Sequence, residues 1–199
     1  MKTFKQFLKE DTSSITNEMK NHFINRTSKH IELVNKYLNK INDLNLPEII
    51  TAVLFDNHDA SKFEEPELTP YIYINWYYHC KNNNIPYTIP NDMATKCNLA
   101  SFYHDKNNPH HPEFWDNNYD ELKILDKGIK YVVDATSMPF SNIAQMIADW
   151  TAMDEELNPE KEKPSAKEWA DKNINIKWKF TPEQIKFIYK LIDLINNIK

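Results

Sequence analysis

Residues 15–43 read ITNEMKNHFINRTSKHIELVNKYLNKIND, and their apolar side chains recur at helical spacing. One face of such a helix carries Phe23, Thr27, His30, Val34, Tyr37, Leu38 and Ile41. This period predicts a long amphipathic helix whose apolar face packs against the core. Because His30 lies within that face, we expect its imidazole to point into the protein.

Glycine is nearly absent from the chain. Gly128 is the only one in 199 residues, where ordinary usage of ~7% would give about fourteen. This scarcity excludes a Gly-rich phosphate loop and a dinucleotide-binding fingerprint, and it disfavours tight β-hairpins. We therefore predict an all-α, single-domain helical bundle whose chemistry rests on side chains.

Apolar residues at helical spacing predict further helices along the chain. These begin near Leu46-Pro47 and span roughly Pro66 to Lys81, Asn91 to Lys106, Tyr119 to Ala135 and Phe140 to Glu155. Capping boxes at residues 165–168 and 181–184 predict two more helix starts. Two prolines bracket His110-His111 and predict an ordered loop there, and the charged stretch from Asn158 to Pro164 predicts a solvated one.

Several predicted helices place a histidine or an aspartate on the apolar face, namely His30, His58, His79, His104 and Asp149. Each histidine alone is compatible with an ordinary hydrogen-bonded core residue. Asp149 is harder to explain, because a carboxylate between Met146 and Met153 is costly to bury without a cation or hydrogen-bonding partner. A metal ion satisfies the buried carboxylate and the buried imidazoles together, so the pattern predicts a metal centre.

Charge and cysteine usage limit the remaining possibilities. The formal net charge of -5 gives no indication of binding to duplex nucleic acid or to an anionic membrane. No apolar run approaches the ~18 residues needed to span a bilayer, and the N-terminus lacks the apolar region of a secretory signal. Cys80 and Cys97 form no CxxC and indicate reduced thiols in a cytoplasmic protein.

The order His30, His58-Asp59, Asp149 resembles the HD-domain superfamily of metal-dependent phosphohydrolases, whose pattern is H…HD…D on an all-α bundle. Residues 58–62, His-Asp-Ala-Ser-Lys, are similar to the HDxGK form of that superfamily, with Ser61 where glycine is usual. Residues 104–115 and 146–150 look like an uncharacterised, often phage-borne branch. The resemblance spans roughly His30 to Met153.

The resemblance implies that His30, His58, Asp59 and Asp149 surround one divalent transition metal, with Mn, Fe, Ni, Co and Zn all open. In two-metal members, further histidines bind a second ion and the HD aspartate bridges. His104 and His79 stand in the right order for that role. His110 and His111 are rivals, because some members use a His-His pair there, and we favour His104. The alternatives are a packed or capping His79 near Trp76 and a His104 that faces substrate. We favour a single tightly held ion.

The implied activity is hydrolysis of a phosphomonoester or phosphodiester, with nucleotides the leading substrate class. Asp59 and Lys62 are the expected catalytic residues, and Lys62, His110 and His111 are expected to contact substrate. The alternatives are a solvated Lys62 and a loop in which one histidine packs against Phe114 or Trp115. Two other functions stay open: an HD-type di-iron oxygenase, and a non-enzymatic phage head or interaction protein with a structural or lost metal.

The first ten residues, MKTFKQFLKE, are similar to the head-targeting leaders of proteins packaged inside tailed-phage capsids. We therefore divide the chain into an N-terminal segment, residues 1–13, and an HD-like domain, residues 14–199. The resemblance implies a location in the host cytoplasm or a phage head. The alternative is an amphipathic helix that docks Phe4, Phe7 and Leu8 on the domain. The oligomeric state is left open.

Overall fold

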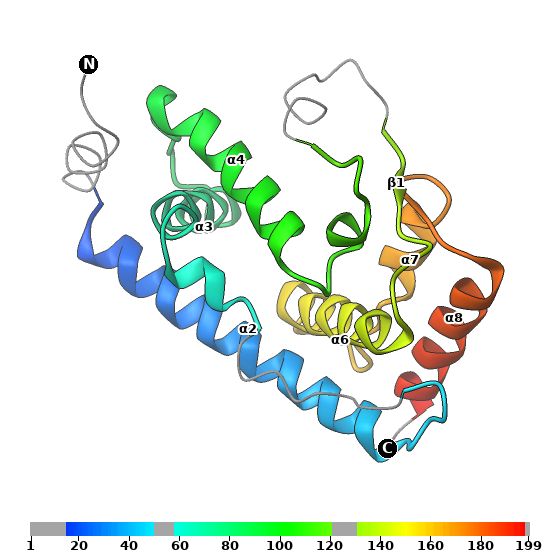
Figure 1. Cartoon of the computed structure of the whole chain (residues 1–199). Coiled ribbons are helices and arrows are strands. Elements are labelled where there is room, and N and C mark those ends of the chain that lie inside the picture. The colour runs from blue at the N-terminus through cyan, green and yellow to red at the C-terminus, as the bar shows by residue number, and fades with distance from the viewer. Residues whose placement is uncertain (1–14, 50–57, 121–130, 198–199) are drawn as a thin grey trace. The chain divides into compact units, whose positions relative to one another are not determined.

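The computed structural model describes residues 15–49, 58–120 and 131–197 (Figure 1). These residues contain six α-helices: α2 (Asn17–Asp43), α3 (Leu68–Asn82), α4 (Asn91–Asn107), α6 (Phe140–Leu157), α7 (Lys167–Asn173) and α8 (Pro182–Asn197). Two short 3-10 helices, η2 (Ala60–Phe63) and η3 (Pro112–Trp115), and a parallel pair of two-residue strands, β1 (Val133–Asp134) and β2 (Trp178–Lys179), complete the described elements. The all-α prediction is confirmed.

The described residues form two compact units. The first combines residues 15–28 with 59–104, and the second combines residues 29–49 and 58 with 105–120 and 131–197. Helix α2 therefore contributes its first part to one unit and the rest to the other. The chain also passes from one unit to the other between His58 and Asp59, and again between His104 and Asp105.

The first unit has a small core built from α2, α3 and α4. Its buried apolar side chains are Met19, Phe23, Ile72, Tyr73, Met93 and Cys97. The predicted inward stripe of α4 is confirmed, because Met93, Cys97, Ala100 and His104 are all buried. The stripe of α2 is confirmed at Phe23 and Thr27.

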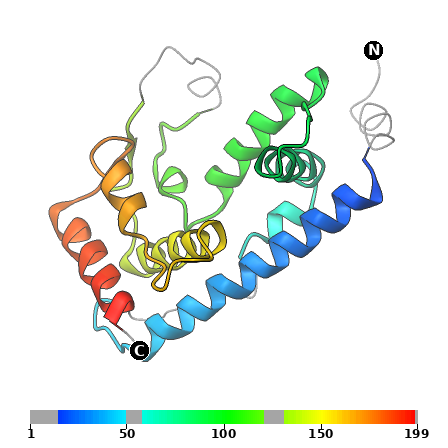
Figure 2. The same cartoon turned by 180° about the vertical axis from the view of Figure 1, so that it is seen from behind.

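The second unit is built around α6, which packs against α8 (Figure 2). Every residue of α6 from Ile143 to Ala148 is buried, and Trp150 stacks on Trp178 with ring centroids 5.1 Å apart. The predicted capping box of α8 is confirmed. The Thr181 amide donates to Oε1 of Gln184 (2.7 Å), and the Gln184 amide donates to Oγ1 of Thr181 (3.1 Å).

Two predicted elements are wrong where the structure describes them. Neither end of the helix expected from Tyr119 to Ala135 is helical. Tyr119 lies in a loop, and Val133–Asp134 is a strand that pairs with Trp178–Lys179. A short run of β-branched and aromatic residues fits either element, and periodicity cannot separate them. The helix expected from Leu46-Pro47 opens as a turn.

The capping box predicted at residues 165–168 is only half formed. The Ser165 hydroxyl accepts the Lys167 amide (3.2 Å), whereas the Glu168 carboxylate pairs with Lys161 and Lys172 (both 3.3 Å). Several predictions concern residues that the structure does not describe. These are the leader over residues 1–13, Ile50 and Leu54 in the second predicted helix, and the middle of the Tyr119 to Ala135 segment.

Candidate metal centre

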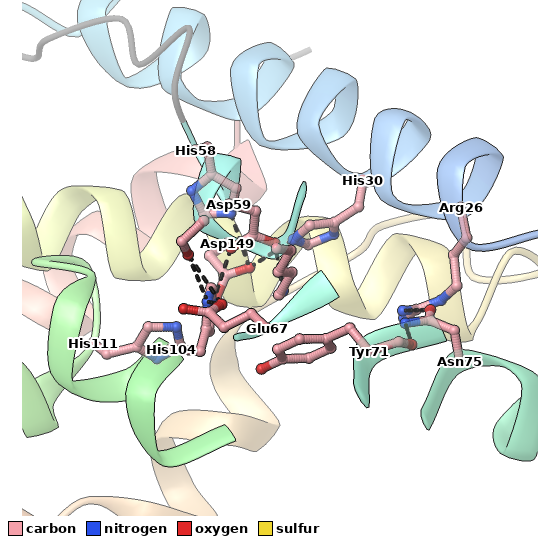
Figure 3. Close-up of polar contacts among 12 residues, drawn as sticks. Arg26, His30, His58, Asp59, Glu67, Tyr71, Asn75, His104, His111 and Asp149 are labelled. Carbon is pink, nitrogen blue, oxygen red and sulfur yellow. Dashed lines mark hydrogen bonds and ion pairs between the residues drawn. The ribbon is translucent and has the colours of Figure 1, made fainter. Parts of the chain in front are cut away.

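Three of the predicted ligands meet in the second unit. His30 comes from α2, Asp149 from α6, and His58 precedes η2 (Figure 3). Oδ1 of Asp149 lies 3.0 Å from Nε2 of His30 and 3.7 Å from Nε2 of His58. One carboxylate oxygen is therefore shared by two imidazoles.

These three side chains are withdrawn from solvent. His30 and His58 are buried, and the Asp149 side chain is 13% exposed. Burial alone would raise the pKa of Asp149, but hydrogen bonds and the charges of His30 and His58 outweigh it and hold the pKa well below its ordinary value. The Asp149 carboxylate therefore stays ionised in the protein interior.

A second carboxylate of α6, that of Glu156, lies on the far side of the His30 ring. Oε2 of Glu156 lies 3.4 Å from Nδ1 of His30, the ring nitrogen that does not face Asp149. A carboxylate on the far nitrogen is the usual way in which proteins orient a metal-binding imidazole. Sequence reasoning did not single out Glu156. Its position seven residues after Asp149, on the same helix face, was the available signal.

The bracketed loop brings His110 to the same unit. Its ring centroid lies 4.3 Å from that of His58 and 4.3 Å from that of His111. His110 is buried, whereas His111 is partly exposed, with Nδ1 3.6 Å from Oδ1 of Asp105. The loop is fixed internally, because the Trp115 indole donates to the Pro109 carbonyl (2.9 Å).

Nitrogen donors come close enough in two histidine pairs to share an ion. Within each pair, His30 with His58 and His110 with His111, one nitrogen of each ring lies within 4.8 Å of the other. The second unit therefore holds buried histidine and aspartate side chains that could bind a metal ion. Nothing in these contacts selects one metal over another.

Asp59 and His104 meet in the first unit (Figure 3), and Lys62 contacts Asp59 there. Asp59 adopts a left-handed backbone conformation, with φ of 59°, directly before η2. Its Oδ2 lies 2.5 Å from Nζ of Lys62, and its Oδ1 lies 3.1 Å from Nε2 of His104. Lys62 is thus paired with Asp59, and its side chain is 19% exposed.

His104 lies between two buried carboxylates. Its Nδ1 is 3.0 Å from Oε2 of Glu67, opposite the contact with Asp59. Burial and the charge of Lys62 lower the pKa of His104, but its hydrogen bonds to Asp59 and Glu67 prevail and raise it. The sequence did not single out Glu67 either, because an acidic residue just before a helix is explained by its favourable interaction with the helix dipole.

His79 lies apart from Asp59 and His104 within the first unit. Its ring stacks on Trp76, with centroids 4.9 Å apart, and contacts the ring of His22 at 4.4 Å. The Asn83 amide lies 3.5 Å from its Nδ1. This is the packed histidine near Trp76 that the sequence offered as the alternative to a metal ligand.

The fold and these contacts define an all-α protein with a buried histidine–carboxylate centre. The chain belongs to a family of unknown function, DUF5662, whose model matches residues 19–194. No curated protein and no solved structure matches it. Among the described residues, no helix is both long and apolar enough to cross a membrane.

Proposed function

We propose that this protein is a metal-dependent phosphohydrolase whose ion is held by His30, His58 and Asp149. The observation that carries the proposal is the buried Asp149 carboxylate between two imidazoles, at 3.0 and 3.7 Å. Ligand atoms about 2.1 Å from one ion lie about 3.0–3.4 Å from each other in octahedral or tetrahedral geometry. The 3.0 Å separation lies within that range and the 3.7 Å separation lies slightly above it, so the donor set supports a divalent transition metal.

The other residues take roles from their chemistry and from the HD-domain resemblance. A divalent ion at this site would lower the pKa of a bound water molecule and polarise a phosphoryl oxygen. Glu156, whose Oε2 lies 3.4 Å from Nδ1 of His30, would orient the His30 ring. The resemblance assigns Asp59, the residue after His58, to the same ion, and assigns Lys62 to the substrate phosphate. Phosphomonoesters and phosphodiesters are the proposed substrates, with nucleotides as the leading class by analogy.

The test compares two aspartates of α6. Protein purified without chelator is analysed for metal and assayed on a panel of phosphoesters, including nucleotides, with Mn²⁺, Co²⁺, Ni²⁺ and Mg²⁺. We expect about one ion per chain, as for a one-metal site. Asp149→Asn should lose both the ion and hydrolysis. Asp154→Asn is the matched control, because Asp154 is a buried carboxylate of the same helix that binds Lys161 and the Ser165 amide, and it should keep both.

Three outcomes would contradict the proposal. Hydrolysis by Asp149→Asn at the wild-type rate would remove Asp149 from the chemistry. Two irons per chain together with oxygen consumption would instead support a di-iron oxygenase. Bound metal without hydrolysis across the whole panel would favour a non-enzymatic protein with a structural ion.

A further inference from the structure

Ser61, Glu67 and His104 form a hydrogen-bonded chain inside the first unit. Oε2 of Glu67 accepts the Ser61 hydroxyl (3.0 Å) and lies 3.0 Å from Nδ1 of His104. Glu67 and His104 are each 3% exposed, so water does not compete for these bonds. The Glu67 carboxylate is therefore committed to one hydroxyl and one imidazole.

The chemistry of these partners fixes the orientation of the ring. An ionised carboxylate offers only acceptors, so the nitrogen that faces it must carry a proton. Nδ1 of His104 is that nitrogen. Nε2 faces Oδ1 of Asp59 at 3.1 Å, so by the same argument it donates to that second carboxylate in the metal-free protein. The ring is further confined by Tyr71, whose ring meets that of His104 edge-on at 5.6 Å between centroids.

We propose that Glu67 is a positioning residue, which keeps the proton of His104 on Nδ1 and presents Nε2 beside Oδ1 of Asp59. A carboxylate behind an imidazole raises its basicity and aims its other nitrogen at a cation. The consequence for metal binding rests on the proposed function, whereas the orientation of the ring does not.

Ser61 gains a role from the same arrangement. It stands where the HDxGK form has glycine, and its hydroxyl supplies the second hydrogen bond to Glu67. Glycine has no side chain to offer there. The departure from the HDxGK form is therefore part of the positioning device. Ser61→Gly removes the bond to Glu67 together with the 3.4 Å contact between the Ser61 hydroxyl and Nδ1 of His104, and it leaves the side chains of Glu67 and His104 in place.

The first measurement is the protonation of His104 in the full-length protein. Long-range ¹H–¹⁵N spectra of the metal-free and zinc-loaded protein report which ring nitrogen carries the proton, and His104→Gln assigns the signals. We expect a protonated Nδ1 in the wild type. In Glu67→Gln the amide can donate as well as accept, so the proton should no longer be held on Nδ1. Glu67→Asp keeps a carboxylate and should restore the wild-type pattern at least partly.

The second measurement is the affinity for Mn²⁺. We expect Glu67→Gln to weaken it by about 10–100-fold, and Ser61→Gly to weaken it by less. Asp154→Asn is the control, because it removes an equally buried carboxylate outside the first unit and should leave the His104 signals and the affinity unchanged.

The two measurements separate this proposal from the proposed function. A wild-type His104 with a bare Nδ1, or a Glu67→Gln variant with unaltered ring signals, would overturn the positioning role whether or not metal binds. Unchanged Mn²⁺ affinity in Glu67→Gln would overturn the proposed consequence for metal binding, and the ring signals alone would then decide the positioning role. If the wild type takes up no ion, the proposed metal centre fails, and the ring signals alone decide the role of Glu67.

Discussion

Trp178→Phe tests how the C-terminal part of the chain supports the loop that carries His110. The Trp178 indole donates to Oε1 of Glu113 at 2.8 Å, and Glu113 is 1% exposed. Phenylalanine retains an aromatic ring to stack on Trp150 but removes the N–H donor. Lys177 can replace it only in part, because it lies 3.3 Å from the same oxygen and is itself half exposed.

The expected loss of stability has two parts. A hydrogen bond to a charged, buried acceptor contributes about 1.5–3 kcal/mol. The smaller ring buries roughly 40 Å² less apolar surface, which costs about 1 kcal/mol. We therefore expect Trp178→Phe to lower the free energy of unfolding by about 2.5–4 kcal/mol, measured by urea denaturation. Trp169→Phe, at a side chain that is 38% exposed, is the control and should change it by less than about 1 kcal/mol.

A double-mutant cycle with Glu113→Met isolates the bond. Each single variant leaves one buried polar group without its partner, whereas the double variant replaces both by apolar groups. The double variant should therefore be less destabilised than the sum of the two single variants by about 1–2 kcal/mol. Additivity to within about 0.5 kcal/mol would refute the reasoning, because it would mean that the indole–carboxylate bond adds nothing.

Two other predictions concern single aspartates. Asp59→Ala should abolish metal-dependent phosphoester hydrolysis while leaving the far-ultraviolet circular dichroism of a helical protein; full activity in this variant would exclude Asp59 from the chemistry. Burial raises the pKa of Asp116, but hydrogen bonds from the Tyr131 hydroxyl and the Asp134 and Asn118 amides outweigh it and lower the pKa. Its contribution to stability is therefore complete above the ordinary pKa of 3.8 and is lost as the pH falls through the lower pKa of the folded state. Thermal unfolding of Asp116→Asn should show a smaller dependence on pH below 3.8 than the wild type, and equal slopes would exclude this contribution.

Sequence periodicity located buried residues well where a helix has one clear apolar face. His30 and His104 each lie between apolar residues at helical spacing, and both are buried. In α3 the periodicity predicted a face of Ile72, Trp76 and His79, of which Ile72 is buried whereas Trp76 and His79 are half-buried. Thr69, Tyr73 and Cys80 define its buried face, and His79, one residue earlier than Cys80, falls at the edge of that face.

The carboxylates that orient the two histidines were harder to find. Glu67 and His104 lie 37 residues apart in the chain, and Glu156 lies still further from His30. Local patterns indicate on which face of its own helix a residue lies. They do not indicate which residue of another helix it contacts. Partner choice depends on how two helices are aligned, and that alignment is a tertiary property.

The alignment of α2 with α6 shows what sets the partners of His30. Nζ of Lys36 and the hydroxyl of Tyr37 both bind Glu155, at 2.7 and 2.5 Å. From His30 to Tyr37, and from Asp149 to Glu155, each helix advances by about two turns. These contacts fix the axial register of the two helices in the second unit. A shift of one turn along the axis would displace His30 by about 5 Å relative to Asp149. The polar contacts around Glu155 therefore set the position of His30 relative to Asp149 from a distance, through the rigidity of two helices.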